Sequence, residues 1–126
     1  MRRVVVTGMG IVSSIGNNTD EVTQSLRDAK SGITFSEDFA EHGFRSQVWG
    51  KPTLDPKDLV DRRAMRFLST GGAWNHVAMD QAIADSGLEE SDITNERTGI
   101  IMGSGGPSTR TIIDAAETTL KNNSPK

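Results

Sequence analysis

The chain has 126 residues, enough for one domain that buries a sizeable core. Its net charge of −3 argues against nucleic acid as a partner, and no run of eighteen apolar residues is present to cross a membrane. Because cysteine is absent, the chain has no disulfide, thiolate metal site or cysteine nucleophile. We expect a cytoplasmic protein.

The first sixteen residues organise the chain. Residues 2–6 are a valine-rich run, which predicts a strand buried on both faces in a sheet covered by helices. The run Thr7–Gly10 follows, and its two glycines permit close approaches of the backbone that side chains would prevent. We expect a tight, partly buried loop from there to Gly16.

A helix is predicted over Thr19–Ala29. Asn18 can cap it and Glu21 lies three residues on, as in a capping box, while Gly32 is the expected stop signal. Val22 and Leu26 share one face of this helix, which should pack against the sheet.

The same helix start bears on a rival interpretation of the glycines. The pattern Gly8-x-Gly10-x-x-Ser13 is similar to a dinucleotide-binding fingerprint, in which a helix begins within the glycine loop and holds the pyrophosphate. Here the capping signal comes eight residues after Gly10. The spacing therefore argues against a dinucleotide-binding domain.

Residues 36–58 predict a long, irregular surface loop. Aromatic and apolar side chains scattered around it should anchor it to the body of the protein. These side chains are Phe35, Phe39, Phe44, Val48 and Trp49.

Three arginines within five residues are the sharpest charge feature: Arg62, Arg63 and Arg66. Arg62 and Arg66 lie one helical turn apart and would share a face. The residues alone leave two interpretations open. The segment is either a solvated helix start with Asp61 as its counter-ion, or a docking site for an acidic partner, since arginine suits carboxylates and phosphates.

A long helix is predicted from Ser69 to about Ser86, before Gly87. The small residues Gly71 and Gly72 within it indicate close packing. One helical face carries Phe67, Gly71, Trp74, Ala78 and Ala82.

The last third of the chain predicts a strand, a loop and a helix. Thr98–Met102 should be a second core strand, parallel to and beside the first. The glycine-rich loop that follows could seat an anion or pass closely over a neighbouring element, and composition does not decide between these. Residues 109–121 predict an amphipathic helix.

The opening Thr7-Gly8-x-Gly10-Ile11-Val12-Ser13, followed by Ile15-Gly16-Asn17, resembles that of the β-ketoacyl-acyl-carrier-protein synthases. These are condensing enzymes of fatty-acid synthesis in the thiolase-like superfamily. The residues Ser13–Gly16 are closer to the type I branch, and further similarity at residues 31–50 and 80–88 extends the resemblance over essentially the whole chain. It implies an α/β fold with thiolase-like αβαβα layers, of which residues 1–126 would be the N-terminal part of the first half.

The resemblance implies a 3-oxoacyl-carrier synthase, an acyltransferase acting as a homodimer. Such an enzyme condenses an acyl thioester with malonyl-carrier by a decarboxylative Claisen reaction, using a cysteine and two histidines. None of these maps onto residues 1–126, because cysteine is absent and neither His42 nor His76 matches a catalytic histidine. We therefore expect no catalytic residue, metal or cofactor in this chain, and no condensation by the chain alone.

The resemblance also implies two sites. Arg62, Arg63 and Arg66 would receive the acidic recognition helix of acyl carrier protein. Arg45 would join them, as would Lys126 from the other subunit of the dimer. Gly106 and Pro107 would lie beside the fatty-acyl pocket at the dimer interface.

One alternative stays within the same fold. A non-catalytic subunit, similar to chain-length factors, would keep the architecture but replace the nucleophile. In either case the chain by itself should expose a sheet edge and dimer surfaces, and should tend to associate.

Overall fold

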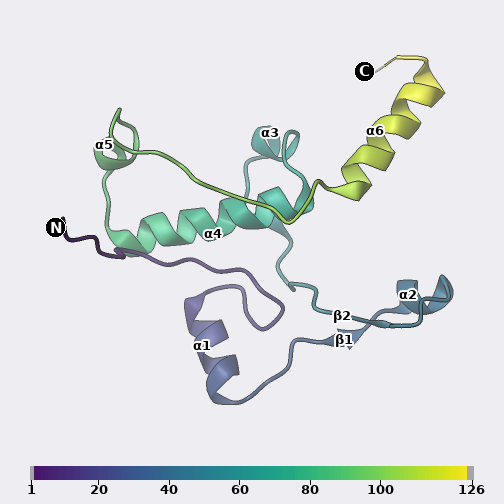
Figure 1. The fold of residues 1–126 in the computed structure, drawn as a ribbon, viewed down its shortest axis with the longest axis horizontal. Helices are drawn as coiled ribbons and strands as arrows, with labels where there is room; N and C mark the ends of the chain where they lie inside the picture. Colours follow the sequence, from purple (N-terminus) through teal and green to yellow (C-terminus); the bar gives the residue numbers. More distant parts are fainter. Residues whose placement is uncertain (1, 125–126) are drawn as a thin grey trace.

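The computed structural model describes residues 2–124. Figure 1 shows an open arrangement of short helices around one long helix, with a small hairpin to one side. The elements of the described residues are α1 (Thr19–Arg27), β1 (Thr34–Phe35), α2 (Glu37–Glu41), β2 (Val48–Trp49), the 3₁₀ helix η1 (Pro56–Asp58), α3 (Arg62–Met65), α4 (Thr70–Ser86), α5 (Glu90–Ile93) and α6 (Thr109–Asn122). No helix in this part of the chain is long and apolar enough to cross a membrane.

Helix α4 is the centre of the fold, and its predicted span is confirmed, whereas the predicted face is wrong at Phe67 and Gly71, which are exposed. The Ser69 hydroxyl accepts a hydrogen bond from the Gly72 amide at 3.2 Å, which caps the first turn. Gly87 ends the helix in the left-handed conformation, with φ of 66°. Ala73 and Val77 are buried, with 0% and 4% of their surface exposed.

The glycine loop packs on the backbone of α4. A Cβ atom added to Gly10 would lie 1.8 Å from the Ala78 carbonyl oxygen, and one added to Gly8 would lie 2.2 Å from that of Ala82. Only glycine permits such an approach. The predicted close approach is confirmed, and the element approached is α4.

Two side chains of α4 hold this loop in place. Asp85 accepts a hydrogen bond from the Met9 amide at 2.9 Å. Gln81 accepts one from the Ile11 amide at 3.1 Å and donates one to the Asn17 carbonyl at 2.7 Å. The loop amides and carbonyl are thus satisfied by side chains rather than by a neighbouring strand.

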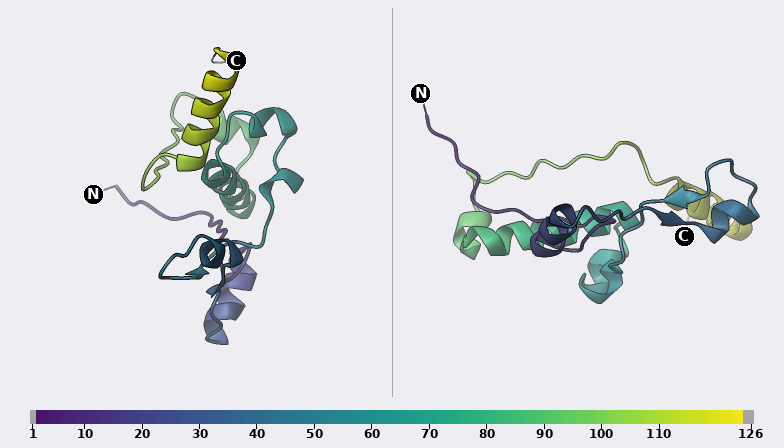
Figure 2. Two further views of the ribbon diagram at one scale, coloured as in Figure 1. Left: turned by 90° about the vertical axis from the view of Figure 1, so that its right-hand side faces the viewer. Right: turned by 90° about the horizontal axis from the view of Figure 1, so that it is seen from below.

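The two predicted core strands are not formed by the described residues. Residues 2–6 and 98–102 run along α4 as separate segments (Figures 1 and 2), and neither is a strand. A hollow of about 280 Å³ is lined by Gly10 of the glycine loop, by α4 and by Ile101. Val4 and Ile101 are 91% and 97% exposed. A strand requires a hydrogen-bonding neighbour strand, and these segments have none among the described residues. The predicted packing of α1 on such a sheet is therefore also wrong.

Helix α1 begins as predicted but ends two residues early. The Asn18 side chain accepts a hydrogen bond from the Glu21 amide at 3.0 Å, and the Glu21 carboxylate accepts one from the Asn17 amide at 2.8 Å. The helix stops at Arg27, where Ala29 takes a φ of 51°. The prediction that Gly32 ends this helix is therefore wrong, because the chain leaves the helical conformation before Gly32.

Residues 36–58, predicted as an irregular loop, contain α2, β2 and η1, and β2 forms a hairpin with β1, which lies just before this segment. Strands β1 and β2 pair antiparallel, with Thr34 opposite Trp49 and Phe35 opposite Val48, and α2 lies between them. The ring of Phe39 lies 5.2 Å from that of Phe44 and 5.6 Å from that of Trp49, between centroids. These aromatic side chains pack within the hairpin, and Trp49 also lines a hollow with Trp74 of α4.

Helix α6 confirms the predicted C-terminal helix. Ser108 caps it by accepting a hydrogen bond from the Thr111 amide. In Figure 1 it extends away from α4, and its apolar side chains stay exposed, with Ile112 at 54% and Leu120 at 83%.

Candidate functional site

Residues 55–66 carry the clustered basic side chains and contain two turns whose backbone amides are held by carboxylates. Asp55 accepts a hydrogen bond from the Lys57 amide at 3.0 Å at the start of η1. Asp61 accepts hydrogen bonds from the amides of Arg63 and Ala64, at 2.8 and 3.3 Å, and so caps α3. Both carboxylates thereby position the basic side chains that follow them.

Asp61 is an N-cap and not a counter-ion. In the part of the chain that the structure describes, the ion pairs are His76 with Asp80 and Arg110 with Asp114, each at 3.5 Å. None of the α3 arginines takes part in one. The interpretation of Asp61 as a local counter-ion is therefore wrong.

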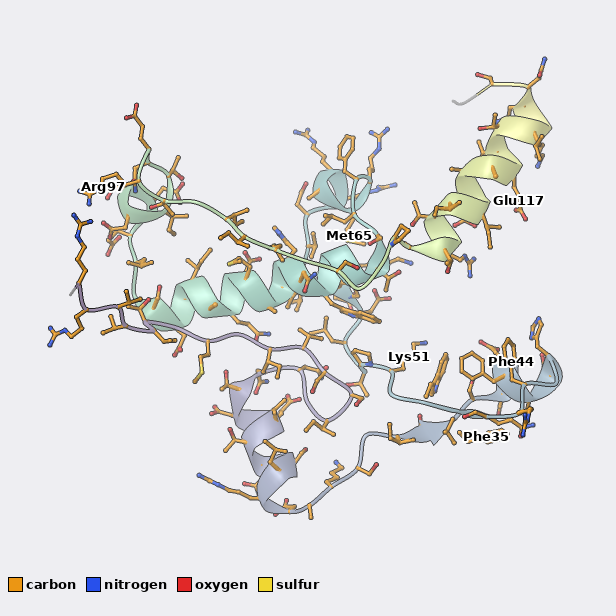
Figure 3. The ribbon with its side chains drawn as sticks, viewed as in Figure 1. Phe35, Phe44, Lys51, Met65, Arg97 and Glu117 are labelled. Carbon is orange, nitrogen blue, oxygen red and sulfur yellow. The ribbon has the colours of Figure 1, made fainter. Side chains whose placement is uncertain are left out.

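Arg62 and Arg66 lie on one side of α3, as predicted. Both line a hollow of about 470 Å³ together with Lys57 and Met65. The three basic residues are exposed, whereas Met65 is half-buried. Figure 3 shows Met65 on the side of α3 that lies toward α4. Arg63 is exposed on the same short helix but does not line this hollow.

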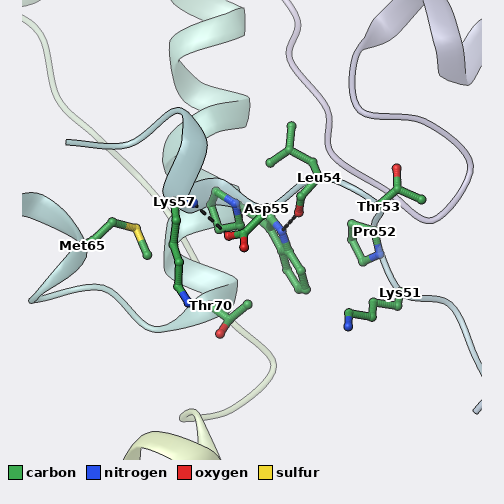
Figure 4. A pocket seen from close by; sticks show the side chains of 10 residues that line it. Lys51, Pro52, Thr53, Leu54, Asp55, Lys57, Met65 and Thr70 are labelled. Atoms are coloured by element: carbon green, nitrogen blue, oxygen red, sulfur yellow. Dashed lines mark hydrogen bonds between the residues drawn. The ribbon is translucent and has the colours of Figure 1, made fainter. Parts of the chain in front are cut away.

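A second hollow, of about 310 Å³, adjoins the first. It is lined by residues 51–57, Met65, Thr70 and Trp74 (Figure 4), and the Trp74 ring nitrogen donates a hydrogen bond to the Leu54 carbonyl at 3.2 Å. Lys57 and Met65 belong to both hollows. Sequence reasoning missed Lys57, because Lys57 lies in η1 and the helical spacing that links Arg62 to Arg66 does not extend to it.

The other predicted docking residues are not brought to this surface. Arg45 is exposed between α2 and β2, in the hairpin, which Figure 1 shows apart from α3. Lys126 lies outside the described residues.

Gly106 and Pro107 are exposed in the segment before α6. The Ser104 hydroxyl donates a hydrogen bond to the Gly106 carbonyl at 2.6 Å. A Cβ atom added to Gly106 would meet no described atom within 4 Å, so no neighbour among these residues requires a glycine there.

The two histidines have local partners, and the glycine loop contacts α4. A His42 ring nitrogen lies 2.8 Å from the Asp38 carbonyl oxygen, and His76 pairs with Asp80. The described residues contain no group of three or more His, Asp or Glu side chains that could hold a metal ion. Gly8 and Gly10 face the α4 backbone, so the space that a pyrophosphate would need is filled, which argues further against dinucleotide binding.

Comparison with known proteins points to one family. A family model for the β-ketoacyl synthase N-terminal domain matches residues 1–125. The 3-oxoacyl-[acyl-carrier-protein] synthase 1 of Escherichia coli K12 is 52% identical over 111 residues, which cover 87% of this chain and 27% of that protein. The protein of the same name from Haemophilus influenzae is 46% identical, covering 83% of this chain and 26% of that protein. A 3-oxoacyl-[acyl-carrier-protein] synthase 2, from Coxiella burnetii, is 33% identical over 82% of this chain and 25% of that protein.

A solved structure also matches the fold. A solved structure described as the ishigamide ketosynthase/chain length factor superimposes with a TM-score of 0.81 at 29% identity, over 98% of this chain and 31% of that one. The α/β, thiolase-like fold and the similarity to the type I branch are thus confirmed, although the two core segments are unpaired here. The chain spans about a quarter of the length of the curated relatives it matches. It belongs to the β-ketoacyl synthase family, in the N-terminal domain.

Proposed function

We propose that residues 1–126 form the N-terminal part of a 3-oxoacyl-acyl-carrier-protein synthase of fatty-acid elongation. The observation that carries this proposal is the 52% identity, over 87% of the chain, to a protein with that name. The lower identity of 33% to a type 2 synthase favours the type I branch. The enzyme would be a cytoplasmic homodimer that condenses acyl and malonyl thioesters.

The condensation chemistry would come from residues outside this chain. The sequence contains no cysteine, and its two histidines lie on separate elements with local partners. The chain alone should therefore be inactive. Its contribution would be to carry the recognition surface and part of the fold that supports the catalytic half.

The recognition surface would be built on α3. Arg62, Arg63 and Arg66 are exposed and form no ion pair among the described residues, so they remain available for an acidic helix of acyl carrier protein. Arg45 and, from the other subunit, Lys126 would extend this surface. Gly106 and Pro107 would border the acyl pocket at the dimer interface.

Charge reversal on α3 tests the docking proposal. In the full-length protein, Arg62→Glu with Arg66→Glu should weaken carrier binding roughly ten- to a hundredfold, mainly through the association rate, and should flatten its salt dependence. Surface plasmon resonance at two salt concentrations measures both effects. The matched control is Lys30→Glu with Arg97→Glu, which changes the net charge equally at exposed positions away from α3. Unchanged binding by the α3 double variant would remove the docking assignment.

A second candidate function follows from the solved structure that matches, because its description includes a chain length factor. A non-catalytic subunit would share this fold without transferring an acyl group. Intact-mass spectrometry after incubation with an acyl-carrier thioester separates the two. A covalent acyl adduct on the full-length protein supports the synthase, and its absence, with carrier binding intact, supports the non-catalytic subunit.

A further inference from the structure

We infer that the hollow between η1 and α3 receives an apolar side chain from the acidic helix of acyl carrier protein, with Met65 as its contact and Lys57 as an additional docking residue. This inference rests on the proposed function. It adds to the docking surface an apolar centre and a basic residue that the sequence did not assign.

The first argument is the convergence of charge. Lys57 comes from η1, and Arg62 and Arg66 come from α3, yet all three line one hollow of about 470 Å³. Like charges around one hollow repel each other unless an anion lies among them. Residues 51–66 hold five basic and three acidic side chains, whereas the chain as a whole has a net charge of −3. The positive charge is therefore concentrated here.

The second argument is that carboxylates of this segment are already engaged. Asp55 accepts from the Lys57 amide, and Asp61 accepts from the amides of Arg63 and Ala64. These contacts shape the turns and do not neutralise the basic side chains. In the described part of the chain, none of the three cations around the hollow forms an ion pair. All three are exposed and thus accessible to the carboxylates of a partner.

The third argument is the apolar centre. Met65 is half-buried and lines both adjoining hollows, and Figure 4 shows its thioether on the Lys57 side. A helix that offers carboxylates to Lys57 and to the two arginines places the residue between them over Met65. An apolar contact inside a charged rim is the usual anatomy of a protein interface, and methionine adapts its shape to such a contact. A nucleic acid or a free phosphate would make no use of it.

Single substitutions in the full-length protein test this inference. Lys57→Glu should weaken binding of acyl carrier protein roughly three- to tenfold, while Lys57→Arg should leave it nearly unchanged. Met65→Glu should weaken binding by a similar factor, and Met65→Leu should preserve it. Lys30→Glu is the charge-matched control, since Lys30 is also exposed but follows α1.

The outcomes are distinct. If the wild-type protein binds the carrier but Lys57→Glu and Met65→Glu bind equally well, the inference is wrong and the proposed function stands. If the wild-type protein fails to bind the carrier at low salt, both fail. Binding of a single-stranded oligonucleotide that Lys57→Glu abolishes, without loss of carrier binding, would also overturn it. Because Lys57 is exposed, its substitution should not unfold the protein. Lys57→Glu therefore tests the inference even if Met65→Glu unfolds the protein.

Discussion

At the scale of residues, Gly10 and Gly71 show how a glycine can be required in one place and dispensable in another. Gly10→Ala would place a Cβ 1.8 Å from the Ala78 carbonyl oxygen, so the loop must move off α4. We expect a loss of at least about 1–3 kcal/mol of unfolding free energy. Gly71 lies within α4, and beyond its own helix backbone and chain neighbours no described atom would lie within 4 Å of an added Cβ, so Gly71→Ala should stabilise by about 0.5–1 kcal/mol.

Urea denaturation of both variants measures this difference. Equal midpoints for Gly10→Ala and the wild type would mean that the loop does not rest on α4. The pair also shows the limit of composition. The sequence predicted close packing at both Gly10 and Gly71, but only the structure reveals that the surroundings of Gly71 are open.

The candidate site shows the same limit. Arg62 and Arg66 could be assigned to one face from their spacing alone, because a helical turn is a local property. Lys57 could not be assigned from the sequence, because its position beside the two arginines depends on the turns that Asp55 and Asp61 fix in η1 and α3.

At the scale of elements, the three longest helices were predictable and the two core strands were not. The beginnings of α1, α4 and α6 each follow a side chain that accepts a backbone hydrogen bond: Asn18, Ser69 and Ser108. Capping involves neighbours in sequence, so the signal is local. Residues 2–6 and 98–102 have the composition of strands, but a strand also needs a partner, which composition does not specify.

The cap of α4 provides the prediction at this scale. Ser69→Ala removes the acceptor for the Gly72 amide and should destabilise the protein by about 1 kcal/mol. Ser69→Asp keeps an acceptor and should restore most of the stability. Thermal unfolding followed by circular dichroism compares the two, and a Ser69→Ala protein as stable as Ser69→Asp would show that the cap has little effect.

At the scale of the whole molecule, apolar side chains lie where a larger assembly would cover them. Val4, Ile101 and Leu120 are 91%, 97% and 83% exposed, on three separate segments. The unpaired segments 2–6 and 98–102 also leave backbone groups available for pairing. The chain spans about a quarter of its curated relatives, so the surface that covers these side chains would come from the remainder of such a protein or from a second subunit.

The isolated 126-residue chain should therefore associate in a concentration-dependent manner. Sedimentation velocity over a range of concentrations should show species heavier than the 13.6 kDa monomer. Val5→Lys with Ile101→Lys places a charge on each unpaired segment, which should shift the distribution toward monomer, because lysine disfavours pairing between exposed edges. Thr19→Lys with Thr109→Lys adds the same charge at helix starts and serves as the control. A wild-type chain that stays monomeric at every concentration would mean that these segments are not interaction surfaces, and that the exposed valines and isoleucines are tolerated as they stand.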